Sequence, residues 1–225
     1  MGTTIIDYIG GTIYSIGNDT VQMYFGSSTI FASGPSILVN GPVDGSLFFV
    51  GGGGSDTVNG GFSGNDTIFG GTGGGYFAGG SGGNNIILAG SGNTTLAGGG
   101  NGDLIFASTQ DSGDVLKASF GQEELIGGAG ATTMVGGTVE NLLYSGPNVT
   151  YMFAGSGQTV FMDGGANAND QIIGFKQGID KFDLNGQTVS TENTGNYGTI
   201  LSLRDGTSVT FYGVSIAATD LENGA

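Results

Sequence analysis

Carboxylates are the only abundant side chains in this sequence that could carry out chemistry. The chain of 225 residues contains 19 aspartates and glutamates, four lysines and arginines, and no histidine or cysteine. Without those two residue types, thiol nucleophiles, disulfides, the usual zinc sites and Ser/His/Asp catalysis are excluded. A pair of carboxylates could serve a glycosidase, but no spacing in the sequence selects such a pair. We therefore expect a non-catalytic protein and not an enzyme.

The charge balance and the hydropathy pattern exclude two further classes of partner. A net charge of −15 repels phosphate backbones, so we expect no nucleic acid. No apolar run approaches the length that an integral membrane span requires. The first residues, MGTTIIDYIGG, have neither the basic nor the apolar region of a classical export signal.

One apolar residue recurs every nine or ten residues along most of the chain, with a single step of eleven. A repeat of this length holds a short strand and a tight turn, and the 50 glycines suit such turns. A single repeat cannot bury its apolar side chain, but stacked repeats can. The sequence therefore predicts an all-β fold, a right-handed parallel β-solenoid of the β-roll type, with two repeats per coil over residues 1–165 and an irregular part at 1–16. The sixteen residues predicted to point inward are Val21, Ile30, Val39, Phe48, Val58, Ile68, Phe77, Ile86, Leu96, Ile105, Leu116, Leu125, Met134, Leu143, Met152 and Phe161.

Three of these repeats resemble a known motif. GGGGSDTVN (51–59), GFSGNDTIF (61–69) and GGGNGDLIF (98–106) resemble the glycine-rich nonapeptide of the RTX family of calcium-binding repeat proteins. DQIIGFKQGIDKFDLNG (170–186) is similar to the segment that often follows the β-roll in that family. The resemblance implies a secreted bacterial protein, exported by type I secretion without an N-terminal signal.

In the RTX family, the aspartate two residues before the inward apolar residue binds calcium, which favours six to eight oxygen ligands. At that position the resemblance implies Asp103 and Glu123 as the one pair of acids on successive turns of the same side. Asp56, Asp66 and Asp114 would form half sites. The rival interpretation is that these carboxylates cap their turns by accepting backbone N–H groups. We expect few Ca²⁺ sites or none, with metal-free turns in 20–43, 71–99 and 141–162.

The residue after each inward position samples the outer face of the sheet. On one sheet this predicted row is entirely apolar: Phe31, Phe49, Phe69, Ile87, Phe106, Ile126, Tyr144 and Met162. Soluble monomers seldom expose so long an apolar strip. We expect it to contact another copy or a neighbouring domain. The alternatives are that a terminal segment covers it, that it forms a second interior layer, or that it binds sugar or lipid.

After residue 165 the period changes, and residues 166–225 are predicted to form capping strands and a tail that resembles a secretion signal. Within them, Arg204-Asp205-Gly206 should turn a hairpin that caps the last coil. The predicted function is a secreted structural, assembly or adhesion module that uses its apolar sheet face. One alternative is the C-terminal module of a larger extracellular protease or lipase. The other is a module that binds carbohydrate or, through outward Thr57, Thr95 and Thr133, ice.

Overall fold

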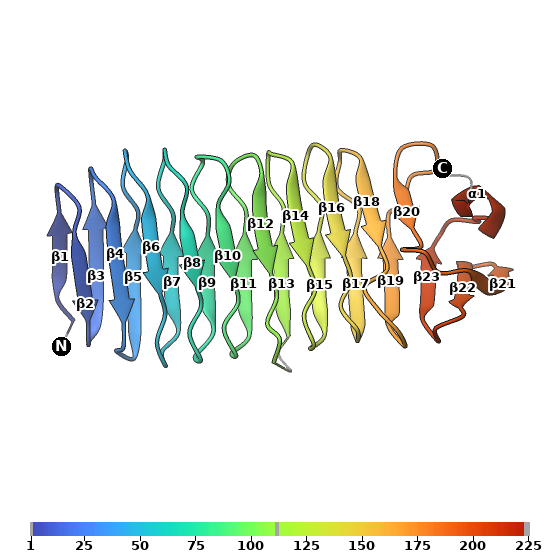
Figure 1. Cartoon of the computed structure of the whole chain (residues 1–225), viewed down its shortest axis with the longest axis horizontal. Helices are drawn as coiled ribbons and strands as arrows, with labels where there is room; N and C mark the ends of the chain where they lie inside the picture. The colour runs from blue at the N-terminus through green and yellow to red at the C-terminus, as the bar shows by residue number, and fades with distance from the viewer. Residues whose placement is uncertain (1, 111–112, 223–225) are drawn as a thin grey trace.

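The computed structural model describes residues 2–110 and 113–222, and these form a parallel β-solenoid of about 9 turns, each of about 19 residues. Each turn contributes one strand to each of two sheets, and the coils stack along one long axis (Figure 1). The all-β solenoid with two repeats per coil is thus confirmed. The strands of the 13-stranded sheet A, in spatial order, are β1 (Thr4–Asp7), β3 (Asn18–Met23), β5 (Ser36–Asn40), β7 (Asp56–Asn59), β9 (Gly75–Ala78), β11 (Thr94–Ala97), β13 (Asp114–Lys117), β15 (Thr132–Val135), β17 (Val149–Phe153), β19 (Asn169–Ile173), β23 (Ser208–Tyr212), β22 (Gly198–Leu203) and β21 (Val189–Gly195).

The 10-stranded sheet B forms the second wall of the solenoid. Its strands pair in parallel, each with the equivalent strand of the next coil. In spatial order they are β2 (Thr12–Ser15), β4 (Ser28–Ala32), β6 (Leu47–Val50), β8 (Thr67–Phe69), β10 (Ile86–Leu88), β12 (Asp103–Phe106), β14 (Glu123–Ile126), β16 (Asn141–Tyr144), β18 (Thr159–Met162) and β20 (Lys181–Asp183).

The core is a narrow double row of side chains between the two sheets. Fourteen of the sixteen predicted inward residues are fully buried. The prediction was wrong at Phe48 and Ile86, which are 39% and 40% exposed, because their neighbours Phe49 and Ile87 occupy the interior instead. Phe49 pairs in register with Ile30 on one side and Ile68 on the other, so it continues the inward row of sheet B.

The turns bring backbone against backbone, which only glycine allows. A Cβ added to Gly80 would lie 1.7 Å from the carbonyl oxygen of Gly61 in the preceding coil. Strands therefore stack at the close spacing of a parallel sheet up to the turn itself.

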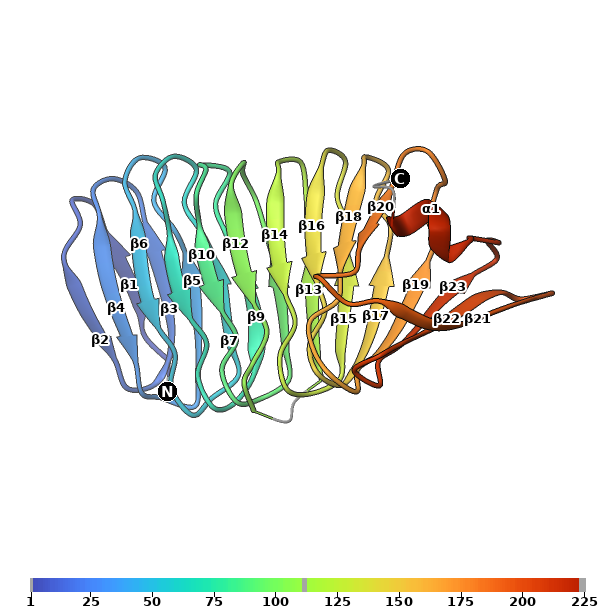
Figure 2. The same ribbon diagram turned by 45° about the vertical axis from the view of Figure 1, so that its right-hand side comes forward.

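The solenoid continues past residue 165, where the sequence predicted the coils to end. β19 and β20 add a strand to each sheet, and only then does the antiparallel region β21–β23 begin. The predicted hairpin is β22–β23, with Gly206 at φ 95° in its turn and Leu201, Leu203, Val209 and Phe211 buried. The helix α1 (Ala218–Glu222) follows and lies at the C-terminal end of the solenoid (Figure 2). Residues 223–225 of the predicted tail lie outside the described residues.

The N-terminal part, predicted to be irregular, forms regular strands. β1 pairs with β3 and β2 pairs with β4, so residues 4–15 complete the first coil.

Candidate functional site

The acids at the predicted calcium position point into the ends of the coil. Asp56, Asp66, Asp103, Asp114 and Glu123 are all 4% exposed or less. Side chains two residues apart on a strand share a face, so an acid two places before an inward residue also points inward. These carboxylates are therefore enclosed by the turns that form the edges of the solenoid.

Each of these carboxylates accepts hydrogen bonds from the backbone. Asp66 takes the N–H of Leu47 in the preceding coil at 2.7 Å and that of Gly61 in its own turn at 2.7 Å. Asp103 likewise takes Asn85 N–H at 2.8 Å and Gly99 N–H at 2.7 Å. One oxygen thus ties a coil to the coil before it and the other fixes the local turn.

On sheet A, Asp114 follows this pattern and Asp56 follows only its first half. Asp114 accepts the N–H of Thr94 at 2.9 Å and of Ser108 at 2.7 Å. Asp56 Oδ1 accepts Ile37 N–H at 3.1 Å, while its Oδ2 is buried without a hydrogen-bond partner.

In coils without an acid at this position, neutral side chains accept the same kind of backbone hydrogen bond. Asn85 Oδ1 accepts Asp66 N–H at 2.8 Å, and Asn141 Oδ1 accepts Glu123 N–H at 3.2 Å. Thr159 Oγ1 accepts Gly155 N–H at 3.1 Å. The turn position therefore requires a hydrogen-bond acceptor, and a carboxylate is one of several that satisfy it.

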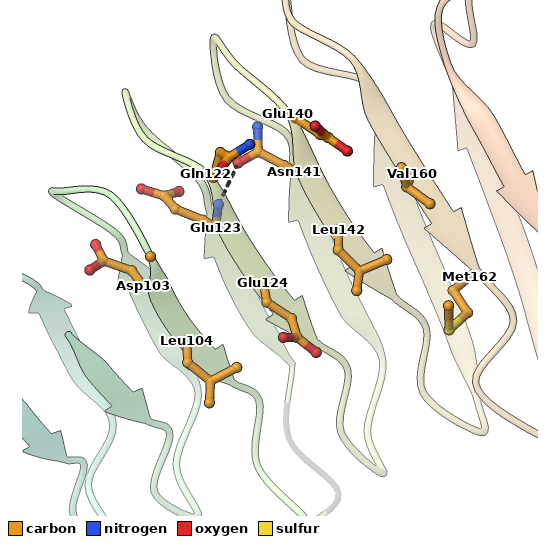
Figure 3. A pocket seen from close by; sticks show the side chains of 11 residues that line it. Asp103, Leu104, Gln122, Glu123, Glu124, Glu140, Asn141, Leu142, Val160 and Met162 are labelled. Atoms are coloured by element: carbon orange, nitrogen blue, oxygen red, sulfur yellow. Dashed lines mark hydrogen bonds between the residues drawn. The ribbon is translucent and has the colours of Figure 1, made fainter. Parts of the chain in front are cut away.

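Asp103 and Glu123 do come together, as predicted, as register partners on β12 and β14. Burial, and to a smaller extent the Asp103 carboxylate, raise the pKa of Glu123 to about 7, although hydrogen bonds from Ser119 act to lower it. Figure 3 shows both side chains at the turn end of a groove of about 580 Å³, with Glu124, Leu142 and Val160 along its outer side. Over 2–110 and 113–222, no cluster of three or more acidic side chains is placed to hold a metal ion.

The outer face of sheet B carries one fully apolar row and a second, mostly apolar row that contains Thr29, Thr67 and Glu124. The row C-terminal to the inward residues runs, in register from β4 to β18, through Phe31, Val50, Phe69, Leu88, Phe106, Ile126, Tyr144 and Met162. The row N-terminal to them runs through Thr29, Phe48, Thr67, Ile86, Leu104, Glu124, Leu142 and Val160. We call these two rows together the apolar face.

Two residues of the predicted interface row were misplaced. Phe49 and Ile87 are fully buried in the core, and Val50 and Leu88 take their places outside. The other six, Phe31, Phe69, Phe106, Ile126, Tyr144 and Met162, lie on the outer face as predicted and are half-buried or exposed. The sequence prediction also missed the second row, in which Phe48 packs against Phe69 with ring centroids 5.7 Å apart.

Described segments leave most of the apolar face uncovered, but at its C-terminal end Asn185, in the loop after β20, donates to the Tyr144 hydroxyl at 3.3 Å. All described strands belong to one of the two sheets, the antiparallel region extends sheet A, and α1 lies at the C-terminal end (Figure 2). Phe31 and Phe48 are 37% and 39% exposed. Among the described residues, a C-terminal segment therefore reaches the face at Tyr144, and the six outward residues of the predicted row do not form a second interior layer.

The outer face of sheet A is more polar. Asn59 Nδ2 donates to Asn40 Oδ1 at 3.0 Å, and Asn40 Nδ2 donates to Gln22 Oε1 at 3.1 Å, which forms an amide ladder. The predicted threonines occupy alternate strands, separated by larger side chains such as Tyr76 and Val115. The two walls of the solenoid thus differ in chemistry.

Together, the fold and its surfaces define a parallel two-sheet β-solenoid with polar turns and one apolar wall. Comparisons with known proteins find no matching family, no matching curated protein and no matching solved structure. Among the helical residues described, none form a helix long and apolar enough to cross a membrane.

Proposed function

We propose that this protein is a non-catalytic structural module that associates with a second copy of itself through the apolar face. The observation that carries the proposal is the double row on eight successive strands, β4 to β18, which described segments leave open except at Tyr144 and in which one side chain, Glu124, is charged. Exposed apolar surfaces of this length mark interaction sites in soluble proteins.

The charge of the chain favours this face as the contact between copies. Two chains of net charge −15 repel each other, and the repulsion is weakest where the surfaces carry least charge. The wall of sheet A also exposes apolar side chains, among them Leu38, Tyr76 and Tyr151. Its outer rows are interrupted, however, by Gln22, Asn40, Asn59 and Lys117.

Sedimentation velocity as a function of protein concentration tests the proposal. The wild-type chain should associate reversibly, and Leu88→Glu, in the middle of the face, should weaken association by at least about tenfold, because a carboxylate would be desolvated there. Thr95→Glu adds the same charge to the outer face of sheet A and should leave association within about twofold of wild type. A wild-type chain that stays monomeric, or two variants that behave alike, would refute the proposal.

The finer proposal, that this solenoid is an exported RTX-type module, is supported by sequence resemblance. The three nonapeptide-like repeats and the segment 170–186 carry that resemblance. The full chain should therefore appear in the medium of a bacterial host that carries a type I exporter. The same host without the exporter should retain it, and equal retention in both hosts would count against the proposal.

A further inference from the structure

Aromatic and aliphatic side chains alternate along one row of the apolar face. Between β4 and β18, in the row C-terminal to the inward residues, rings lie on β4, β8, β12 and β16, and aliphatic side chains lie on β6, β10, β14 and β18. The alternation ends at the flanking strands, where Tyr14 on β2 stacks on Phe31 and Asp183 on β20 follows Met162. The period of the rings is thus two coils, about 9.6 Å at a strand spacing of about 4.8 Å. Large and smaller side chains in alternation allow a facing surface to interdigitate.

We infer that a second copy of this chain docks on the apolar face in one register, with the two solenoid axes antiparallel; the inference rests on the proposed self-association. The two-fold axis of this dimer runs parallel to the strands and passes between β10 and β12. A two-fold contact of this kind is closed, so association stops at the dimer.

The alternation fits this symmetry because eight strands form the row. The two-fold axis places β10 opposite β12 and β8 opposite β14, and the outer strands follow the same rule. Leu88 of one copy then meets Phe106 of the other, and Phe69 meets Ile126. Every ring faces an aliphatic side chain, so protrusions meet recesses along the whole row.

The second row places its one charge opposite a hydroxyl group. In the same register, Glu124 on β14 faces Thr67 on β8 of the other copy. The hydroxyl can donate to the carboxylate, which lowers the cost of taking that charge out of water.

A shift by two strands keeps both matches, with Glu124 opposite Thr29, but it pairs only the six strands β4 to β14 of the apolar face instead of eight, so the register proposed here is the one with the larger contact. A shift by one strand sets ring on ring and aliphatic on aliphatic, and it places Glu124 on β14 opposite Phe48 on β6. A two-fold axis along the solenoid places each strand opposite the same strand of the other copy. Glu124 of one copy then lies opposite Ile126 of the other, and the two Glu124 carboxylates approach each other. Both arrangements leave a carboxylate without a donor in an apolar contact.

The contact is large enough for a specific but weak dimer. Eight strands of about four residues cover roughly 38 Å by 13 Å, or about 500 Å² on each copy. The total of about 1,000 Å² lies at the lower limit for specific interfaces. We therefore expect association that depends on concentration.

Cross-linking of single introduced cysteines tests the register directly, since the chain has no cysteine of its own. Thr67→Cys and Glu124→Cys, mixed and treated with a short bis-maleimide, should give a cross-linked heterodimer. Either variant alone should give at least about tenfold less cross-linked product, because its cysteines lie three strands of sheet B apart across the dimer, about 14 Å. Dimers of Thr67→Cys alone would instead indicate parallel axes or an antiparallel register shifted by two strands, and either would overturn the inference.

A charge substitution provides a second reading without cross-linking. Thr67→Lys should tighten association by about fivefold, because the lysine meets Glu124 of the other copy, and Thr67→Glu should weaken it by a similar factor. With parallel axes the two introduced lysines would face each other, so weaker association of Thr67→Lys would contradict the register. Wild-type chains that do not associate at all would refute the proposed function, whereas association with the wrong cross-links would refute the register alone.

Discussion

Glu123 makes the stability of this solenoid depend on pH. Burial at the turn end of β14 raises its pKa from 4.5 to about 7, against the lowering effect of the Ser119 hydrogen bonds, and the Asp103 carboxylate adds to the rise. Between these two values the folded chain holds a proton that the unfolded chain has released. The free energy of unfolding therefore falls as the pH rises from 4.5 to about 7. A difference of roughly 2.5 pKa units corresponds to about 3 kcal/mol.

Glu123→Gln isolates this contribution. Glutamine is neutral at every pH and keeps both local contacts, because its Oε1 can accept Ser119 N–H while its Nε2 donates to the Ser119 hydroxyl. Near pH 4.5 the variant and the wild type should have similar free energies of unfolding. At about pH 8.5 the variant should be more stable by about 3 kcal/mol.

Urea unfolding in the presence of a chelator, at both pH values, measures this difference. Other buried acids, such as Asp170 with a pKa of about 7 caused mainly by burial, contribute the same trend to both proteins and cancel in the comparison. A difference between the two proteins that does not change with pH would refute the reasoning. Loss of stability in the variant at both values would show instead that the carboxylate, in its charged form, is required by the turn.

Three further predictions follow from the packing of the coils. Phe49→Ala should lower the free energy of unfolding by about 3–5 kcal/mol, whereas Phe48→Ala should cost less than about 1 kcal/mol; equal costs in chemical denaturation would show that the inward row has the other register. Gly80→Ala should strongly destabilise the fold, because its Cβ would lie 1.7 Å from the Gly61 carbonyl oxygen, while Gly195→Ala, with no heavy atom within 4 Å, should leave the melting temperature nearly unchanged. Excess chelator should leave the circular-dichroism melt of the wild type nearly unchanged, since backbone N–H groups bond most of the turn carboxylates, with Asp56 Oδ2 an exception; an unfolded chain under these conditions would show that calcium holds the coil together.

The inward row could be predicted from the sequence wherever one apolar residue stands alone in its repeat. Val58 and Leu116 have polar neighbours on at least one side, so one register is clearly better than the other. In LFFV (47–50) and NIIL (85–88) the adjacent residues are both apolar, and the repeat alone does not choose between them. The sheet does choose, since Ile30, Phe49, Ile68 and Ile87 are each 19 residues apart along one wall. Comparing every second repeat, rather than every repeat, would have placed Phe49 and Ile87 inside.

The direction of the turn acids was only partly predictable. Their position two residues before an inward side chain fixes the face they share with it. The position does not show which N–H groups donate to these carboxylates, because a donor such as Leu47 N–H is 19 residues away from Asp66 in the sequence. A carboxylate that binds calcium and one that accepts N–H groups look the same in a single repeat. The partners become visible only when consecutive coils are stacked.

The apolar face illustrates which surface properties depend on register and which do not. In β6 and β10, the two strands that the sequence prediction misaligned by one residue, the residues that would point outward in either register are apolar. Sheet B therefore has an apolar outer face in either register. The alternation of rings and aliphatic side chains, by contrast, depends on the register of β6 and β10. With Phe49 and Ile87 placed outside, the row would begin with three consecutive aromatic residues, and a two-fold partner would meet no regular set of recesses. With Val50 and Leu88 outside, the same symmetry pairs each ring with an aliphatic side chain. A hydrophobic surface could therefore be inferred from composition and period, whereas the geometry of its partner depends on a one-residue choice that the stacking of the coils makes.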